Sequence, residues 1–582
     1  MVLSMQMVLR TQTPKYPFKF PMQLTLVATA VALLVGVSAT VAQTVPNAGD
    51  ALRQAQPPVL PAAPAAALPQ VGGSTIEAPM TVLPSGPKVD VKSIEVIGNR
   101  VIDTATLAAL VADGAGKTLS LPELEALAQR ITRYYRANGY FVARAYIPAQ
   151  EVSSGAIKIR VVEGNYGKFI LKNESLVRND IVQAMLDDVL SQDIVSLETL
   201  ERVMLIINDT PGVKVTRADV MPGDKVGTSD FAVDTQATAA RNGYVLLDNY
   251  GSAYTGKNRL SFNADFNSPT ARGDRMSISG LGTDTGGLLN GRVGYSALLR
   301  ANGLRGEVAL SRTQYALGSI YSSLDAKGTA DALDATLTYP IRRIRAQTIE
   351  ASLNASHKAL EDKIQSTNTV TPKKSSTVTA GISLRDERKL LGADGLTQAS
   401  LMLTAGHLQI NESVAAANDA AGANTAGSFG KITASISRIS LLPKAFTLTT
   451  SLKLQQSLNS KNLDGSERMA VSGSNGVMGN PSGELIGSNA ALIRLELSRP
   501  LPALGDLQSR WSLFTNWGQA EAAKAVSPTD KRRSISDVGI GWAAEYKGAI
   551  IRTHLAHRPN SDQPLSEPHP RNKLLVQAGW VF

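Results

Sequence analysis

The C-terminal part of the chain, residues 240–582, alternates apolar and polar side chains over many short segments. Successive side chains of a strand point to opposite faces, so one set can face lipid and the other a lumen. The last segment shows this most clearly, with Leu574, Val576, Ala578, Trp580 and Phe582 on one face. Residues 260–266, 333–339, 493–497 and 538–546 are the other strong cases. We count about sixteen such segments, an even number within the range of bacterial outer-membrane barrels.

The links between these segments fall into two length classes. Residues 340–345, 441–444 and 547–548 form short links, whereas 314–329, 357–374, 410–428, 457–488, 519–535 and 558–571 form long polar ones. Short turns at one rim and long loops at the other are typical of a transmembrane barrel. A soluble β-sandwich or β-solenoid would explain the alternation but not the two length classes. The aromatic share of 5% is low for a barrel with two aromatic girdles.

The N-terminal residues form two segments of different composition. Residues 1–42 have a basic start, an apolar core and a small residue, Ala42, at the expected cleavage point, which is typical of a secretory signal peptide. An inner-membrane anchor is the alternative for this segment. Residues 43–88 are rich in Pro and Ala, which predicts an extended linker. A short helix, which could act as a plug, can form around residues 47–56.

Residues 89–164 and 165–235 predict two small domains with the same order of elements, β-α-α-β-β. In the first, Ser120 and Glu123 form a capping box at the start of a helix with an apolar stripe. Strands are expected at 91–97, 140–147 and 156–162, and in the second domain at 167–171, 213–220 and 229–235, with helices at 177–190 and 197–208. An exposed strand edge in each domain can accept an extended peptide as an added strand. The alternative is that the domains are only spacers.

Composition and candidate chemistry give no sign of an enzyme. The formal net charge is +10, but Lys and Arg are scattered, so a channel wall or an anionic lipid surface explains them without nucleic acid. There is no cysteine, and therefore no disulfide. His554 and His557 have a spacing that places them on opposite faces of a strand. Residues 280–282 lack the strand-turn-helix setting of a phosphate-binding loop. We expect no catalytic site, metal or cofactor.

Three motifs in order carry a family resemblance. The first domain contains Tyr135, Gly139, Tyr140, Tyr146, Pro148 and Gln150 at the matching places of a polypeptide-transport-associated (POTRA) domain. Residues 206–213 look like the matching stretch of a second such domain, and residues 248–256 resemble a first barrel strand and its loop. Together with the linker and the barrel pattern, these motifs resemble the outer-membrane transporters of two-partner secretion, the haemolysin secretion/activation family of ShlB, FhaC and HecB type, related to the BamA/TamA superfamily.

The resemblance implies a fold, a place and a function. The fold would be mainly β, a barrel of about 16 antiparallel transmembrane strands preceded by two α+β POTRA domains. The barrel would lie in the outer membrane, in contact with its lipids, and the POTRA domains in the periplasm. They would capture an unfolded, secreted exoprotein of haemolysin or adhesin type, which the barrel then conducts outward. Trp580 and Phe582 would be the C-terminal signal for the barrel-assembly machinery. A barrel-assembly factor of BamA or TamA type and a passive porin are the alternatives.

The chain departs from the family at one pair of motifs. In the family, the Arg of a Val-Arg-Gly-Tyr motif on a loop inside the lumen meets the Asp of a Phe-x-Asp-x-Gly motif on the wall. The matching residues here are Gly476, Val477, Met478, Gly479, Asn480 and Glu484 on the loop, and Phe514, Asn516 and Gly518 on the wall. Met478 replaces the Arg and Asn516 the Asp, so both charges are lost together. We expect Met478 to face Asn516 and the loop to be mobile, held by backbone contacts more than by charge.

Overall fold

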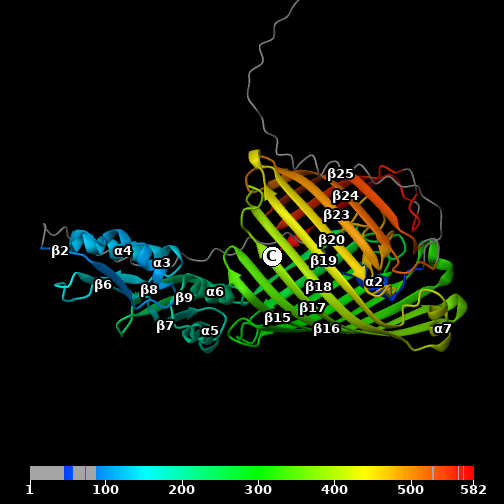
Figure 1. Ribbon diagram of the computed structural model, residues 1–582. Helices are drawn as coiled ribbons and strands as arrows, with labels where there is room; N and C mark the ends of the chain where they lie inside the picture. The colour runs from blue at the N-terminus through cyan, green and yellow to red at the C-terminus, as the bar shows by residue number, and fades with distance from the viewer. Residues whose placement is uncertain (1–44, 57–71, 74–86, 527–529, 561–562, 568) are drawn as a thin grey trace, which may run out of the picture. The chain divides into compact units, whose positions relative to one another are not determined.

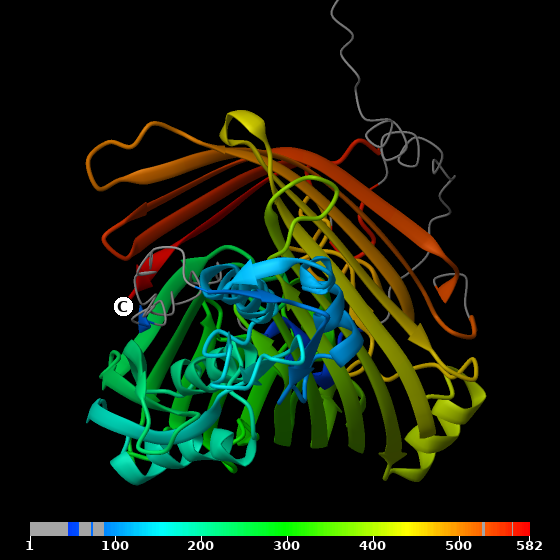
Figure 2. The ribbon, with the colours of Figure 1, turned by 60° about the vertical axis from the view of Figure 1, so that its left-hand side comes forward.

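The computed structural model describes residues 45–56, 72–73, 87–526, 530–560, 563–567 and 569–582. Among these residues, sixteen antiparallel strands close into one barrel around a common interior (Figures 1 and 2), as the sequence predicts. They are β10 (Arg241–Asp248), β11 (Arg259–Asn267), β12 (Arg275–Thr283), β13 (Leu288–Leu298), β14 (Arg305–Ala316), β15 (Ala326–Ile344), β16 (Gln347–Ile364), β17 (Thr369–Asp386), β18 (Gly395–Ile410), β19 (Gly427–Leu441), β20 (Thr447–Ser457), β23 (Asn489–Pro500), β24 (Gln508–Glu521), β25 (Arg533–Tyr546), β26 (Ala549–His557) and β27 (Asn572–Val581).

The alternation along each strand decides which side chains face out of the barrel. On β27 the side chains of Leu574 and Trp580 are 57% and 50% exposed, whereas Leu575 and Gln577 between them are almost completely buried. The same division holds on β11, where Leu260 and Phe262 are exposed and Ser261 is buried. The outer surface is therefore an apolar band that lipid can cover, and the inner surface is mixed.

The prediction of a long link at residues 357–374 is wrong. Residues 357–374 do not form a loop, because β16 continues to Ile364 and β17 begins at Thr369, and residues 359–364 pair with 369–374. Only a short 3-10 turn joins these strands. The pattern failed here because the strands extend beyond the apolar band, where polar side chains such as Glu361 and Lys363 occupy outward positions. Hydrophobic alternation marks only the part of a strand that crosses lipid.

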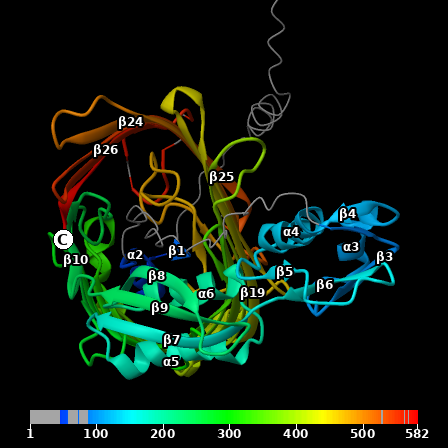
Figure 3. The same cartoon turned by 90° about the vertical axis from the view of Figure 1, so that its left-hand side faces the viewer.

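The first α+β domain contains β2 (Lys88–Asp90), β3 (Ser93–Ile97), α3 (Thr104–Ala109), β4 (Thr118–Ser120), α4 (Leu121–Ala137), β5 (Arg144–Tyr146) and β6 (Ala156–Val162). Its sheet has the order β3-β6-β5, and a separate pair joins β2 to β4 (Figure 3). The capping box forms, because the Ser120 backbone N–H donates to the Glu123 carboxylate over 2.7 Å. The strand expected from Tyr140 is shorter, because Gly139 ends α4 with a φ of +88° and Tyr140 turns back onto the helix.

The second domain contains β7 (Asn165–Glu174), α5 (Asn179–Asp187), α6 (Leu197–Asn208), β8 (Lys214–Pro222) and β9 (Thr228–Gln236). Its sheet has the order β1-β8-β9-β7, in which β1 (Gly72–Gly73) comes from the linker and pairs in parallel with β8 over two residues. An apolar core between the helices and the sheet holds the domain together. Ion pairs connect it to the turns of the barrel, including Asp209 with Arg343 at 2.7 Å and Glu201 with Arg345 at 2.9 Å.

The barrel closes where its first and last strands meet. Only five residues of β10, Tyr244–Asp248, pair in register with β27, fewer than at any other junction of the described barrel strands. Phe582 extends this seam, because its N–H donates to the Gly243 carbonyl over 3.0 Å and its carbonyl accepts from the Gly243 N–H over 2.9 Å. Its ring is 57% exposed on the outer face beside the exposed Trp580. The C-terminal residue therefore adds two hydrogen bonds to the weakest junction.

Deleting Phe582 should lower the fraction of barrel that is folded in outer membranes. The deletion removes two backbone hydrogen bonds from the seam and an aromatic side chain from the membrane interface. The folded fraction can be measured by heat-modifiable mobility in electrophoresis. Phe582→Trp keeps the backbone and an aromatic ring, so this control should fold like the unchanged chain. Equal folded fractions for the deletion and the control would contradict the role of Phe582.

Candidate functional site

A short helix, α2 (Ala48–Gln54), lies inside the ring of barrel strands (Figure 3). Asn47 caps it, since its side chain accepts from the backbone N–H groups of Gly49 and Asp50, and Asp50 completes a capping box. Its Ala face packs on inward-facing residues of the wall, including Tyr315, Ala330 and Leu360. At its C-terminal end Gln54 donates to the Tyr254 hydroxyl over 2.8 Å. The linker therefore supplies a helix that occupies part of the lumen.

The loop between β20 and β23, residues 458–488, also folds inward. It contains the small pair β21 (Met469–Ala470) and β22 (Ile486–Gly487). Its apolar side chains, which include Met469, Val471, Val477 and Leu485, pack on Leu492 of β23 and Ala520 of β24. The loop also contacts α2, because Arg53 donates to the Gly465 carbonyl and Arg468 lies 3.5 Å from the Asp50 carboxylate. We call residues 458–488 the lumen loop.

The motif residues of the lumen loop are buried against the wall. Met478 packs in one apolar cluster with Phe514 of β24, Ala556 of β26 and Leu575 of β27. The Gly479 backbone N–H donates to the Asp537 carboxylate over 2.6 Å. Gly479 has no room for a side chain, because an added Cβ would lie 2.9 Å from Arg558 Cγ and 3.1 Å from Asp537 Cβ. This glycine thus lets the loop backbone approach the wall.

Other motif residues add contacts that hold the loop against the wall. The Asn480 carbonyl accepts from Lys573 Nζ over 3.2 Å, and its side chain is buried. Gly476 lies close to the backbone of Val471, and Gly518 of β24 lies under the side chain of the same residue. The structure thus brings the loop motif and the wall motif to one region.

Met478 and Asn516 are not bonded partners, and an acid next to Asn516 replaces the expected contact. Asn516 donates to Asp537 Oδ1 over 2.7 Å and accepts from Arg494 Nε over 3.3 Å. Asp537 is fully buried on β25, directly opposite Asn516 in the register. It uses its other oxygen for the Gly479 N–H, and so bridges the wall to the loop. Sequence analysis missed Asp537, whose only signal was an inward position beside the wall motif.

The expectation that the loop is held less by charge is wrong. Three loop carboxylates form ion pairs with bases of the wall. Asp464 lies 3.3 Å from Lys373 of β17, and Glu467 lies 2.6 Å from Lys358 of β16 and 2.8 Å from Lys431 of β19. The signs are the reverse of the family's pair, because the acids here belong to the loop and the bases to the wall. The family resemblance concerns charge only at the two motif positions, and these bases lie on other strands, β16, β17 and β19.

Glu484, the third of these acids, is the most enclosed. Its carboxylate is 1% exposed and lies 2.7 Å from a guanidinium nitrogen of Arg533 on β25. It also accepts from the backbone N–H groups of Leu565 and Ser566 and from the Ser566 hydroxyl, at 2.7 to 3.1 Å. Glu484 therefore ties the lumen loop both to the wall and to the link between β26 and β27.

One wall acid connects α2 with the ion pairs of the loop. Asp362 of β16 accepts from the Ala48 N–H at the start of α2 and from the Tyr315 hydroxyl, both over 2.7 Å. It also lies 3.4 Å from Lys373, which pairs with Asp464 of the loop. A carboxylate at a helix N-terminus is electrostatically favourable. Asp362 thus connects the start of α2, through Lys373, with Asp464 of the lumen loop.

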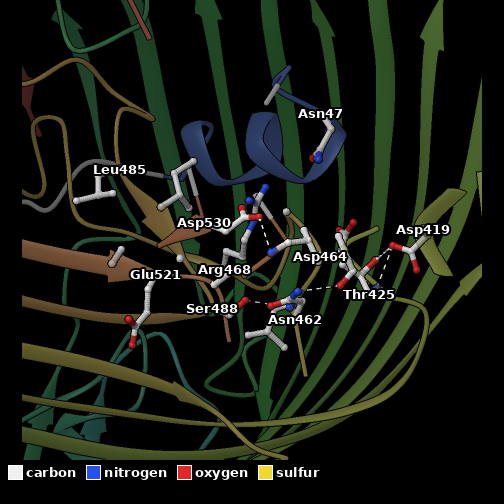
Figure 4. Close-up of a pocket in the computed structure, with 18 of the residues that line it drawn as sticks. Asn47, Asp419, Thr425, Asn462, Asp464, Arg468, Leu485, Ser488, Glu521 and Asp530 are labelled. Carbon is white, nitrogen blue, oxygen red and sulfur yellow. Dashed lines mark hydrogen bonds between the residues drawn. The ribbon is translucent and has the colours of Figure 1, made fainter. Parts of the chain in front are cut away.

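Figure 4 shows Asp464 and Arg468 next to α2. Both line a cavity of about 250 Å³ that has polar and apolar walls. Residues of two outer links close this cavity, among them Asp419 of α7 (Ser413–Ala421) and Asp530 of the link between β24 and β25. Asn462 of the loop donates to the Ala423 carbonyl over 2.8 Å. The outer end of the lumen loop is thus fixed to the extracellular links by neutral hydrogen bonds.

The POTRA motif residues mainly build the first domain. Tyr135 is fully buried, and its hydroxyl donates to the Glu163 carboxylate over 2.8 Å. Burial and then this bond raise the pKa of Tyr135. Tyr140 packs edge-on against Tyr135, with ring centres 5.9 Å apart, and the Gln150 side chain pairs with the backbone of Lys158. Pro148 lies between β5 and β6. Tyr146, which is 38% exposed on the edge strand β5, is the motif residue best placed to meet a partner.

The described residues contain neither a metal-binding cluster nor a membrane-spanning helix. No three His, Asp or Glu side chains there lie close enough together to hold a metal ion. None of the helices described is long and apolar enough to cross a membrane. The segment expected to be a signal peptide lies outside the described residues.

Two family models match the chain. The POTRA domain of ShlB type matches residues 89–164, and the haemolysin secretion/activation protein ShlB/FhaC/HecB matches residues 227–547, more than half of the chain. The chain belongs to this family. It is therefore an outer-membrane transporter of two-partner secretion, a class that works with a secreted exoprotein, and the POTRA domains of the family lie in the periplasm. The fold class expected from the resemblance is confirmed.

Individual relatives agree with the family. The heme/hemopexin transporter protein HuxB of Haemophilus influenzae is 29% identical over 421 residues, which are 72% of this chain and 74% of HuxB. The outer membrane transporter CdiB of Escherichia coli is 28% identical over 211 residues, 35% of each chain. The solved structure of Escherichia coli CdiB has a TM-score of 0.69 at 20% identity and covers 88% of this chain and 94% of its own. CdiB of Acinetobacter baumannii has a TM-score of 0.62 at 16% identity, covering 86% and 91%.

Restoring the family's charges should show strong coupling between Met478 and Asn516. Asn516→Asp alone should destabilise the barrel by several kcal/mol, because it places a second buried carboxylate beside Asp537. Met478→Arg alone should also destabilise it, because it inserts a long charged side chain into an apolar cluster. The double variant should be more stable than the sum of the two effects predicts, by more than about 1 kcal/mol, because the guanidinium can meet both acids.

The measurement is the midpoint of thermal unfolding for the four proteins, together with protease sensitivity of the lumen loop. Asn516→Asp combined with Met478→Leu is the matched control. Leu has about the volume of Met and carries no charge, so it should not rescue the stability of Asn516→Asp. Additive effects, or equal rescue by Leu, would contradict the placement of the loop beside these wall residues.

Proposed function

We propose that this transporter exports a large exoprotein of haemolysin or adhesin type, which its POTRA domains capture in an unfolded state and its barrel conducts outward. The observation that carries the proposal is a closed barrel of sixteen strands whose lumen contains α2 and the lumen loop. A barrel of about sixteen strands leaves an aqueous channel that an extended chain can pass through. Passage requires α2 and the loop to move aside.

The capture step rests on the edges of the two POTRA sheets. In the first domain β3 and β5 are the edge strands of the sheet. In the second, β7 is one edge, and β8 is covered on the other side only by the two residues of β1. An extended peptide can add to such an edge through backbone hydrogen bonds, which are largely independent of its sequence. This suits an exoprotein that must stay unfolded in the periplasm. Tyr146 on β5 would contact it.

The gating step rests on polar contacts. Beyond the small Ala face of α2, the helix is held by hydrogen bonds and ion pairs to Asp362, Tyr254 and the lumen loop. When the helix moves, water and an incoming polar chain can take over these hydrogen bonds. Folding of the exoprotein outside the cell would then supply the drive for transport.

Within this function the loop motif and the wall motif would act together to position the lumen loop. Val477 and Met478 would seat it in apolar pockets, Gly476 and Gly479 would allow close backbone approach, and Asn480 and Glu484 would fix it by hydrogen bonds and charge. Phe514, Asn516 and Gly518 would form the receiving wall. These residues would therefore set how readily the channel opens, and they would not need to contact the exoprotein.

The similarity to HuxB supports a second proposal for the exported protein. HuxB is described as a heme/hemopexin transporter protein, and it matches about three quarters of this chain, whereas the CdiB sequences match about a third. An exoprotein that binds heme or hemopexin is therefore the alternative to a haemolysin or adhesin. Both share the export mechanism, and they differ in what the secreted protein binds.

Deleting residues 89–163 should abolish export while the barrel still forms. The chain would be expressed with the exoprotein encoded beside its gene, and the exoprotein would be measured in the medium and in the periplasm. The full chain should release it, and the deletion should retain it, because the capturing edges of the first domain are lost. Heat-modifiable mobility of both proteins controls for barrel folding.

Normal secretion by the deletion variant would contradict the capture role. If the full chain releases no exoprotein but its removal lowers the amounts of other outer-membrane barrels, the function is barrel assembly, as in the BamA or TamA alternative. Binding of the secreted product to hemopexin, or to a cell surface, would decide between the two cargo proposals.

A further inference from the structure

The outer face of the barrel has a groove between β11 and β16. Gly280 of β12 and Gly291 of β13 are direct cross-strand partners, and both lie at outward positions of their strands. A Cβ added at Gly291 would meet no atom within 4 Å. The ring of Phe262 borders the hollow on one side, since a Cβ on Gly280 would lie 2.5 Å from it. The resulting groove has a volume of about 680 Å³.

The walls of this groove are apolar and face the membrane. Val293 and Leu310 are 48% and 60% exposed, and they form one row across β13 and β14 with Ile278 and Leu333 on the neighbouring strands. Because the barrel lies in the outer membrane, the material in contact with this face is lipid. A hollow of this size beside the pair of Gly280 and Gly291 leaves room for part of an acyl chain.

An ion pair lies at one end of the groove. Arg312 of β14 is the cross-strand neighbour of Gly291 on one side and of Asp331 on the other. Its guanidinium lies 3.5 Å from the Asp331 carboxylate, and the two side chains are 60% and 48% exposed. A charged group on the lipid-facing side is costly at the centre of the bilayer and is tolerated near a headgroup layer. The pair therefore marks the level of lipid headgroups.

The direction of β14 assigns this level to the outer leaflet. The strand runs from the turn at residues 299–304 to the link at residues 317–325, and Arg312 lies near its second end. The first end lies on the side of the POTRA domains, since the same rim of the barrel carries the ion pairs to Asp209 and Glu201. The outer leaflet of a bacterial outer membrane consists of a phosphorylated glycolipid with several acyl chains.

The geometry points to a binding site for this phosphorylated glycolipid, with an acyl chain in the groove of Gly280 and Gly291 and a phosphate on Arg312. Guanidinium has five N–H donors, so Arg312 can bind a phosphate while it keeps its contact with Asp331. Asp331 would hold the guanidinium over the end of the groove. The shape of the groove selects an acyl chain, and the cation selects the anionic headgroup.

The experiment uses the full chain, purified in detergent and incubated with diphosphoryl lipid A or with phosphatidylglycerol. Native mass spectrometry measures how much lipid stays bound. The unchanged chain should retain diphosphoryl lipid A in preference to phosphatidylglycerol. Gly291→Leu fills the groove and should lose this retention. It should fold normally, because its Cβ meets no atom within 4 Å and its side chain extends into the open groove. Arg312→Gln should weaken retention at least about tenfold, as expected for loss of a charge-assisted hydrogen bond.

Lys374→Gln is the matched control, because it removes an exposed cation from an outward position of β17 that does not line the groove. It should bind lipid A like the unchanged chain. Heat-modifiable mobility verifies that each variant is folded. Equal retention by the unchanged chain, Gly291→Leu and Arg312→Gln would overturn the site. Equal retention of lipid A and phosphatidylglycerol by the unchanged chain would overturn the assignment of the ligand class.

Discussion

Ion pairs between carboxylates of the lumen loop and bases of the barrel wall hold the interior of this transporter in place. Glu467 meets Lys358 and Lys431, Asp464 meets Lys373, and Glu484 meets Arg533. Separating a buried pair leaves two charges in a poorly solvated place, which costs several kcal/mol. The loop therefore has one strongly preferred position. Lys373 also pairs with Asp362, which accepts a hydrogen bond from the first turn of α2. The positions of α2 and the lumen loop therefore depend on each other.

The reversed sign of these pairs explains how the chain can lack the family's Arg and Asp. At the motif positions Met478 fills an apolar cluster, and the neutral amide of Asn516 forms hydrogen bonds to Asp537 and Arg494. Asp537 makes the contact to the loop backbone. The ion pairs that anchor the loop lie at other positions, Asp464, Glu467 and Glu484, where the acids belong to the loop and the bases to the wall. An anchor of either sign can fix the loop, because exchanging the two signs leaves the product of the charges, and so the attraction at a given distance, unchanged.

Much of the fold could be predicted from the sequence because alternation has a direct physical cause. Where a strand crosses lipid, as from Leu574 to Phe582, outward side chains must be apolar, and the pattern is plain. Beyond the lipid this constraint ends, which is why the pairing of residues 359–364 with 369–374 was missed. The site was less predictable. Pairs such as Glu467 with Lys358 join residues far apart in the chain, and their positions follow from the register and from the path of the loop, neither of which a local pattern contains.

The most direct test of this account is the conductance of single barrels in planar bilayers, comparing the unchanged chain with Glu467→Gln. The substitution leaves Lys358 and Lys431 without their acid, so the loop and α2 should loosen and the barrel should open more often and to larger conductance levels. Glu361→Gln is the control, because Glu361 lies on β16, the strand of Lys358, but pairs with Lys363 on the outer surface. This variant should behave like the unchanged chain. The account predicts increased opening for Glu467→Gln alone. Opening indistinguishable from that of the unchanged chain would contradict it.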